Sequence, residues 1–94
     1  MAPLKRRVDE LKEELEREGY RDIFLWTDRG GVYYPTHCHQ YEEVRIILEG
    51  EMMLINSKGQ KFYLKAGDRL KVPAGEMHEA YILTDCTYLS GSKY

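Results

Sequence analysis

The sequence predicts an all-β sandwich or barrel that follows a single N-terminal helix. Helical periodicity is confined to residues 1–20, and from residue 21 the apolar residues fall in short segments of extended character. Turn-forming residues separate these segments every eight to twelve positions, which is typical of β-sandwiches and barrels. A chain of 94 residues allows one domain. We therefore expect residues 1–20 to form a helix that packs on the barrel or on a dimer partner, and residues 21–94 to form the barrel.

The helix is expected over residues 3–18. Its apolar residues recur at spacings of four, three and four, and they are Leu4, Val8, Leu11 and Leu15. Pro3 suits a first helical turn, and Gly19 is a natural stop. The apolar stripe is narrow and contains no aromatic residue, so we expect it to pack on protein rather than on a membrane.

Eight strands are expected in the rest of the chain, each bounded by turn-forming residues. They cover residues 22–27, 32–39, 43–48, 51–56, 61–65, 69–72, 77–83 and 86–89.

The first expected strand is unusual because four apolar residues follow one another. They are Ile23, Phe24, Leu25 and Trp26. Since neighbouring side chains on a strand point to opposite faces, both faces should be covered, one of them by the helix or by another subunit. An uncovered sheet edge also favours association, and we therefore expect a homodimer.

Composition excludes several classes of function. The formal net charge is −2, and acidic and basic residues are interspersed, so we expect no nucleic-acid partner. No apolar run approaches the roughly 18 residues of a membrane span, and the charged N-terminus does not resemble a signal peptide. The two cysteines, Cys38 and Cys86, are too few for a disulfide framework. We expect reduced thiols and a cytoplasmic protein.

The histidines point to a metal site. His37 and His39 stand one residue apart, so on an extended strand their side chains share a face. A hairpin after His39 would bring Glu43 back opposite them, and His78 could supply a fourth ligand. Two imidazoles and a carboxylate form a facial ligand set with open positions. We expect one divalent transition metal per chain, and this donor set suits Mn, Fe, Co, Ni, Cu or Zn without choosing among them.

The spacing of these residues resembles the two motifs of the cupin superfamily. The first motif is matched at every fixed position by Gly31, His37, His39, Glu43 and Gly50. The second is matched by Gly67, Pro73, Ala74, Gly75 and His78, with Ile82 where the family usually has asparagine. The resemblance covers residues 21–94 and implies a jelly-roll (double-stranded β-helix) cupin barrel that binds metal through four residues. These are His37, His39, Glu43 and His78.

Arg45 shares the strand parity of Glu43 and should therefore face the barrel interior. A guanidinium in that position must be paired or solvated. One interpretation is that Arg45 binds an anionic substrate held at the metal. The other is a structural ion pair with Glu42, Glu43 or Glu51, and the sequence leaves both open.

Two further residues are expected to line a substrate pocket. Tyr33 and Pro35 share the strand parity of His37, so they should face the same interior. Residues 42–50, EEVRIILEG, also look like the corresponding strand of acireductone dioxygenases, which are metal-dependent cupins. Those enzymes are much longer, so this likeness supports the metal site more than it supports their substrate.

Two classes of function remain. The first is a metal-dependent oxygenase or isomerase acting on a small anionic metabolite bound at open metal positions. The alternative is a non-catalytic sugar- or metabolite-binding module, or a sensor, with a structural metal. Cupin barrels host both, so the fold does not decide. An exchangeable coordination position would favour the enzyme, because structural sites are normally closed.

Overall fold

A computed structural model describes residues 4–94 and has the predicted architecture of one short helix followed by β-strands. Helix α1 spans Leu4–Arg17 and ends one residue before the predicted end; Pro3, the predicted start, lies outside the described residues. Gly19 has a φ of +98° and stops the helix in the left-handed conformation, as the sequence predicts.

Eight strands follow α1. They are β1 (Arg21–Asp28), β2 (Tyr33–His37), β3 (Glu42–Glu49), β4 (Glu51–Asn56), β5 (Lys61–Lys65), β6 (Arg69–Val72), β7 (His78–Ile82) and β8 (Cys86–Lys93). The predicted bounds of β4, β5 and β6 are confirmed. In contrast, β2 ends at His37 rather than at residue 39, and β8 continues past Leu89 to Lys93.

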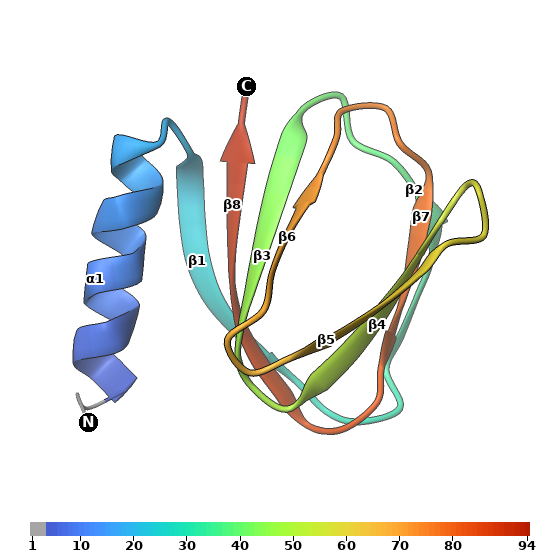
Figure 1. Cartoon of the computed structure of the whole chain (residues 1–94), viewed down its shortest axis with the longest axis horizontal. Helices are drawn as coiled ribbons and strands as arrows, with labels where there is room; N and C mark the ends of the chain where they lie inside the picture. Colours follow the sequence, from blue (N-terminus) through green and yellow to red (C-terminus); the bar gives the residue numbers. More distant parts are fainter. Residues whose placement is uncertain (1–3) are drawn as a thin grey trace.

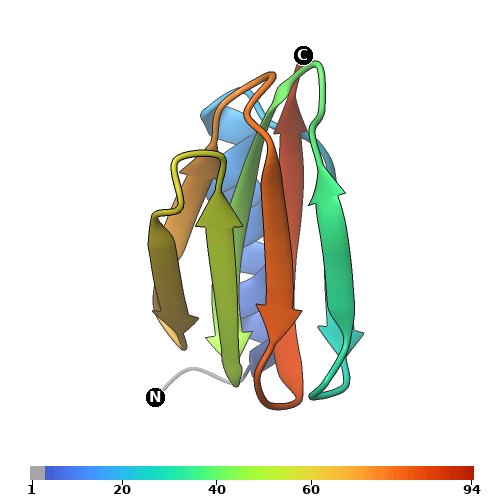
Figure 2. The same cartoon turned by 90° about the vertical axis from the view of Figure 1, so that its right-hand side faces the viewer.

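The strands form two antiparallel four-stranded sheets that face each other (Figure 1, Figure 2). One sheet has the order β1-β8-β3-β6 and the other β2-β7-β4-β5. Helix α1 lies outside the first sheet, beside β1 (Figure 1). This arrangement creates two apolar layers, one between the sheets and one beneath the helix.

Strand β3 shows how the sequence produces both layers. Val44, Ile46 and Leu48 belong to the cluster beneath α1, whereas Ile47 belongs to the cluster between the sheets. The alternate residues Glu43 and Arg45 also face the space between the sheets, where Arg45 was expected. Because one side of this strand contacts the helix and the other faces the interior, nearly the whole strand is buried or half-buried.

The apolar β1 strand is covered only in part. Ile23 packs with the cluster beneath α1, but Phe24, Leu25 and Trp26 remain 48%, 42% and 52% exposed. The expected covering of both faces is therefore not achieved within a single copy of this chain.

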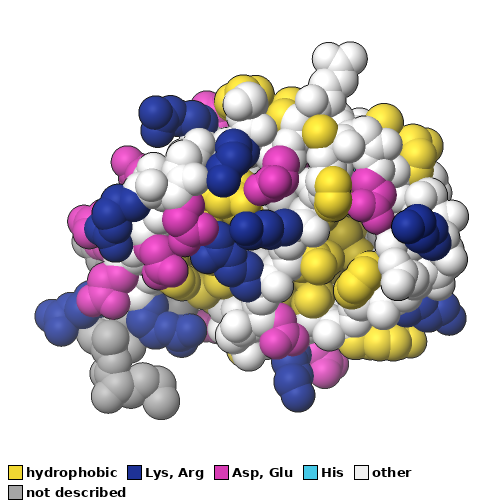
Figure 3. Space-filling model, turned by 45° about the horizontal axis from the view of Figure 1, so that its top comes forward, with side chains coloured by type: hydrophobic (Ala, Val, Ile, Leu, Met, Phe, Trp, Pro, Cys, Tyr) yellow, Lys and Arg dark blue, Asp and Glu magenta, His cyan; other side chains and the backbone are white. Residues whose placement is uncertain are grey.

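The surface agrees with the mixed charge of the sequence. On the face in Figure 3, lysine and arginine side chains alternate with acidic ones and form no continuous basic patch. Cys38 is exposed, Cys86 is buried, and both are free thiols. Within residues 4–94, no helix has the length and apolar character needed to span a membrane.

Candidate metal site

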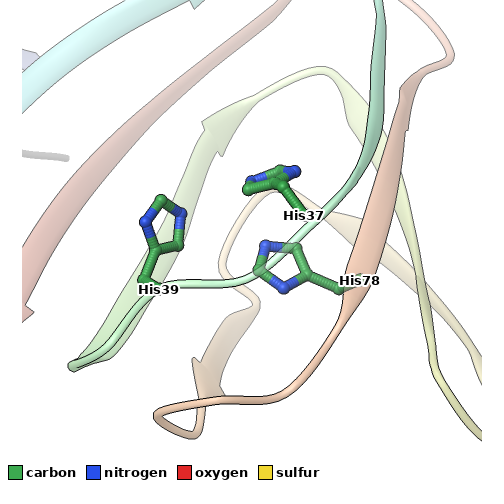
Figure 4. Close-up of side chains that lie close together, drawn as sticks. All are labelled: His37, His39 and His78. Carbon is green, nitrogen blue, oxygen red and sulfur yellow. The ribbon is translucent and has the colours of Figure 1, made fainter.

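Three histidines from separate segments meet at one end of the space between the sheets (Figure 4). His37 ends β2, His39 lies in the following loop, and His78 begins β7. Each offers a ring nitrogen, and these nitrogens all lie within 4.8 Å of one another. His37 and His78 are cross-strand partners, which explains why two residues far apart in the sequence become neighbours.

Two of the imidazoles are oriented by backbone carbonyls. The Nδ1 atom of His37 lies 2.7 Å from the carbonyl oxygen of Pro35, and that of His78 lies 3.0 Å from the carbonyl oxygen of Glu76. A carbonyl can only accept, so both Nδ1 atoms carry the proton. This tautomer leaves the Nε2 lone pair of each ring free to bind a metal.

Glu43 joins the histidines through His39. Its carboxylate is buried, and Oε1 lies 3.1 Å from Nε2 of His39 and 3.2 Å from Nη2 of Arg45. The Nη1 atom of Arg45 also donates to Oγ of Ser90 at 2.6 Å. Of the carboxylates considered for an ion pair with Arg45, Glu43 is the one in contact, and Glu42 instead accepts a hydrogen bond from Tyr20.

A pocket of about 410 Å³ extends from this group between the two sheets. One part of its wall is polar, formed by His37, His39, Glu43, Arg45 and His78. The rest is aromatic and aliphatic, formed by Phe24, Trp26, Tyr34, Met52, Leu54, Ala80 and Tyr88. Sequence reasoning did not assign Phe24 and Trp26 to the pocket, although alternation along β1 places both on one face.

Tyr33 and Pro35 do not line this pocket. Tyr33 is 45% exposed, and its hydroxyl donates to Glu79 on the outside of the barrel. The expected parity fails because the β2–β7 register shifts between Tyr34 and His37. This bulge moves Tyr34, not Tyr33, onto the face of His37.

Pro35 lies within the bulge, and its carbonyl, rather than its ring, contributes to the site by orienting His37. Proline within a strand is largely confined to edges and bulges, so Pro35 itself was the sequence signal for the shift.

Comparison with known proteins identifies the fold family. The family model described as "Cupin domain" matches residues 24–90, which is most of the chain. This chain belongs to the cupin family. The match includes all three histidines that the sequence motifs single out.

Solved cupin structures agree with this assignment. A cupin superfamily protein from Desulfitobacterium hafniense is 24% identical with a TM-score of 0.70, over 76% of this chain and 64% of that one. A cupin-2 domain protein from Shewanella frigidimarina is 23% identical with a TM-score of 0.69, over 81% and 72%. The DMSP lyase DddQ from Ruegeria pomeroyi is 26% identical with a TM-score of 0.70, over 77% and 37%.

One curated protein shares local sequence similarity with this cupin. An acireductone dioxygenase from Leishmania major is 42% identical over 50 residues. The aligned part is 49% of this chain but only 14% of that protein. The chain also spans less than two thirds of the Desulfitobacterium structure.

The donor set of this cupin fits a divalent transition metal. Imidazole and carboxylate ligands suit that class of ion, and two of the three rings already have the tautomer that binding requires. The ring nitrogens of the three histidines lie close enough together to share one ion. Glu43 lies next to this group through its contact with His39.

Burial lowers the pKa of His78 below the ordinary histidine value of about 6.5, and the neighbouring charges of His37 and Arg45 act in the same direction. As the pH drops through about 6.5, the unfolded chain therefore binds a proton that the folded chain does not. We expect the free energy of unfolding to decrease over this window, and metal affinity to decrease as the imidazoles become protonated. Urea unfolding of the metal-free protein at about pH 7.5 and about pH 5.5 measures the first effect. A His78→Asn variant should lose less stability between these conditions, and an equal loss would show that His78 is not its source.

Proposed function

We propose that this cupin binds one divalent transition metal per chain and acts as a metal-dependent oxygenase or isomerase on a small anionic metabolite. The proposed ligands are His37, His39, Glu43 and His78. The observation that carries the proposal is the convergence of three imidazoles in the polar part of a 410 Å³ pocket, a volume suited to a small molecule. Similarity to a protein named acireductone dioxygenase supports oxygenase chemistry in particular.

A divalent metal in this position supplies a Lewis acid and coordination positions for substrate oxygens. The chain supplies Arg45 beside it, facing the same pocket. A guanidinium has five N–H donors. Arg45 donates three hydrogen bonds, to the carbonyl oxygen of Val44, to Ser90 and to Glu43. Its remaining donors and its charge suit it to hold a carboxylate or enolate oxygen near the ligand group.

The alternative is a non-catalytic metabolite- or sugar-binding module, or a sensor, with a structural metal. One observation favours it. Among the described residues that line the pocket, the histidines and Glu43 are all proposed ligands, so none of them remains free as a general base.

Metal loading followed by turnover assays separates the two functions. Metal-free protein would be reconstituted in turn with Mn, Fe, Co, Ni, Cu and Zn, and then supplied with small enolates and diketones. Oxygen uptake or isomerised product with at least one metal supports the enzyme. Saturable ligand binding without turnover supports the binding module. A protein that takes up none of these metals at neutral pH contradicts both.

Replacing Arg45 with methionine should separate its two roles. The Arg45–Glu43 pair is largely buried, so loss of the guanidinium removes the cationic partner of a buried carboxylate and should cost up to about 3 kcal/mol in unfolding free energy. If Arg45 also holds the ligand anion, affinity for small carboxylates should fall at least tenfold while the metal is retained. Thermal melts with and without metal, together with carboxylate titrations, measure the two effects. An unchanged melt and unchanged binding would refute both roles, and Arg45→Lys serves as the control that keeps the charge.

We also propose that the cupin forms a homodimer through β1. This strand is at the end of its sheet, and Leu25 on it is 42% exposed. Both features favour pairing with another copy. Sedimentation at high micromolar concentration should give a dimer mass, and Leu25→Lys should shift it towards the monomer. Tyr63→Lys, on an edge strand of the other sheet, should leave the dimer intact, and a monomeric wild type would contradict the proposal.

A further inference from the structure

The aromatic part of the pocket begins beside the charged part. Phe24 lies in the same cross-strand row as Arg45, with Ser90 between them. Trp26 lies in the next row, beside Tyr88. The wall therefore changes from charged to aromatic over one or two rows of the sheet.

A buried carboxylate fixes the rings of this wall. Asp28 is 7% exposed, and its Oδ1 atom accepts from Nε1 of Trp26 at 2.9 Å. The hydroxyl of Tyr34 lies 2.9 Å from both carboxylate oxygens, and the hydroxyl of Tyr88 donates to Oδ2 at 2.8 Å. Burial, followed by the bond to Asp28, raises the pKa of both tyrosines, so both hydroxyls remain protonated donors. One side chain thus holds three aromatic rings in place.

The wall is fixed but uncovered. Trp26 is 52% exposed and Phe24 is 48% exposed, although both line the pocket. Flat apolar surfaces that are already ordered bind a flat partner with little further loss of conformational entropy.

Charge sets the direction in which a ligand can lie. The contacts that Asp28 makes in this wall are with neutral donors, so its negative charge disfavours an anion there. Arg45 and the three histidines line the polar part of the pocket, where the guanidinium can pair with an anion. An anionic ligand would therefore place its charge beside Arg45 and its neutral end beside Trp26.

We infer that the ligand of this pocket is a small acid whose other end is a flat apolar group, such as an aromatic ring, held between Phe24, Trp26 and Tyr34. Asp28 acts as the positioning residue that orients Trp26 and Tyr34. The inference rests on the proposed function in that it concerns the same pocket, and it narrows the class of small anion that the pocket takes.

Trp26 provides the signal for a test, because it is the only tryptophan in the chain. Zinc-loaded protein would be titrated with phenylacetate, acetate and benzyl alcohol, following Trp26 emission and, independently, the heat of binding. Phenylacetate should bind at least tenfold more tightly than either fragment. Trp26→Leu should abolish that preference by calorimetry, and Trp26→Phe, which keeps a ring, should retain part of it. Tyr63→Leu, an exposed tyrosine outside the pocket, is the matched control and should bind as the wild type does.

Asp28→Asn tests the positioning role separately. It should increase the rotational freedom of Trp26, measured by fluorescence anisotropy decay, and weaken phenylacetate more than acetate. A purely structural role would lower stability without altering the anisotropy of the folded protein, and that result would overturn the role of Asp28.

The remaining outcomes distinguish this inference from the proposed function. Equal affinities for phenylacetate and acetate in metal-loaded protein would overturn the inference and leave the function standing. Preferential binding of phenylacetate by a protein that takes up no metal would support the inference while the function fails. Loss of phenylacetate binding as the protein concentration rises would show that a second copy covers the wall, and would overturn the inference.

Discussion

Replacing both His37 and His39 with alanine should reduce metal content from about one ion per chain to none detectable, while the barrel stays folded. The two imidazoles supply half of the proposed ligands, and a site left with Glu43 and His78 lacks the facial set that holds a transition metal. Elemental analysis of untagged protein, after incubation with metal and dialysis, measures the loss. Circular dichroism of the same samples checks the fold.

The matched control is Cys38→Ser, because Cys38 lies between the two histidines and is exposed. This variant should keep the wild-type metal content. If it loses metal as the double alanine variant does, the thiol is a ligand and the proposed donor set is wrong. Full metal retention in the double alanine variant would place the site elsewhere.

Gly50→Ala should destabilise the fold more than any other single substitution proposed here, by up to about 6 kcal/mol. Gly50 has a φ of +82°, and a Cβ atom at this position would lie 2.0 Å from the carbonyl oxygen of Asp85 and 2.8 Å from Cα of Cys86. Both obstacles are backbone atoms of the neighbouring chain segment, so no side-chain rotation relieves them. Denaturant unfolding, or loss of folded protein altogether, measures the effect.

Gly59→Ala separates the two causes of this loss. Gly59 also has a positive φ, +77°, but nothing lies within 4 Å of the Cβ position. It should therefore show only the backbone strain of about 1–2 kcal/mol. Equal losses at the two positions would mean that the close contact with Asp85 does not determine the role of Gly50.

Sequence reasoning predicted the parts of this cupin that depend on local periodicity and spacing. Apolar repeats predicted α1, and the turn signals predicted every strand, because both are properties of neighbouring residues. The paired motifs also selected the three histidines that the structure brings together.

The features of the fold that depend on packing were harder to predict from the sequence. The end of β8 was missed because Ser90, Gly91 and Ser92 resemble a loop in sequence. In the structure, a Cβ atom at Gly91 would lie 3.3 Å from side-chain atoms of Ile23 and Tyr20. The close packing of these two side chains therefore favours glycine at this position. Ser90 is buried, and its hydroxyl accepts from Arg45.

The sequence also did not predict the contacts of residues that lie at the ends of strands or near a bulge. Asp28 lies just outside the strand expected over residues 22–27, yet it ends β1 as a buried acceptor for three aromatic side chains. Strand parity predicted that Tyr33 faces the pocket. Because of the bulge between Tyr34 and His37, Tyr34 faces the pocket instead. A single register shift reverses every parity argument beyond it, and only the paired strand reveals the shift.

X-ray absorption spectroscopy of the zinc-loaded protein tests the metal site most directly. We expect a first coordination shell of nitrogen and oxygen atoms at about 2.0–2.2 Å, together with the outer scattering of several imidazole rings. A sulfur contribution at about 2.3 Å would mean that a cysteine binds the metal. A shell without imidazole scattering would contradict the assignment of His37, His39 and His78 as ligands.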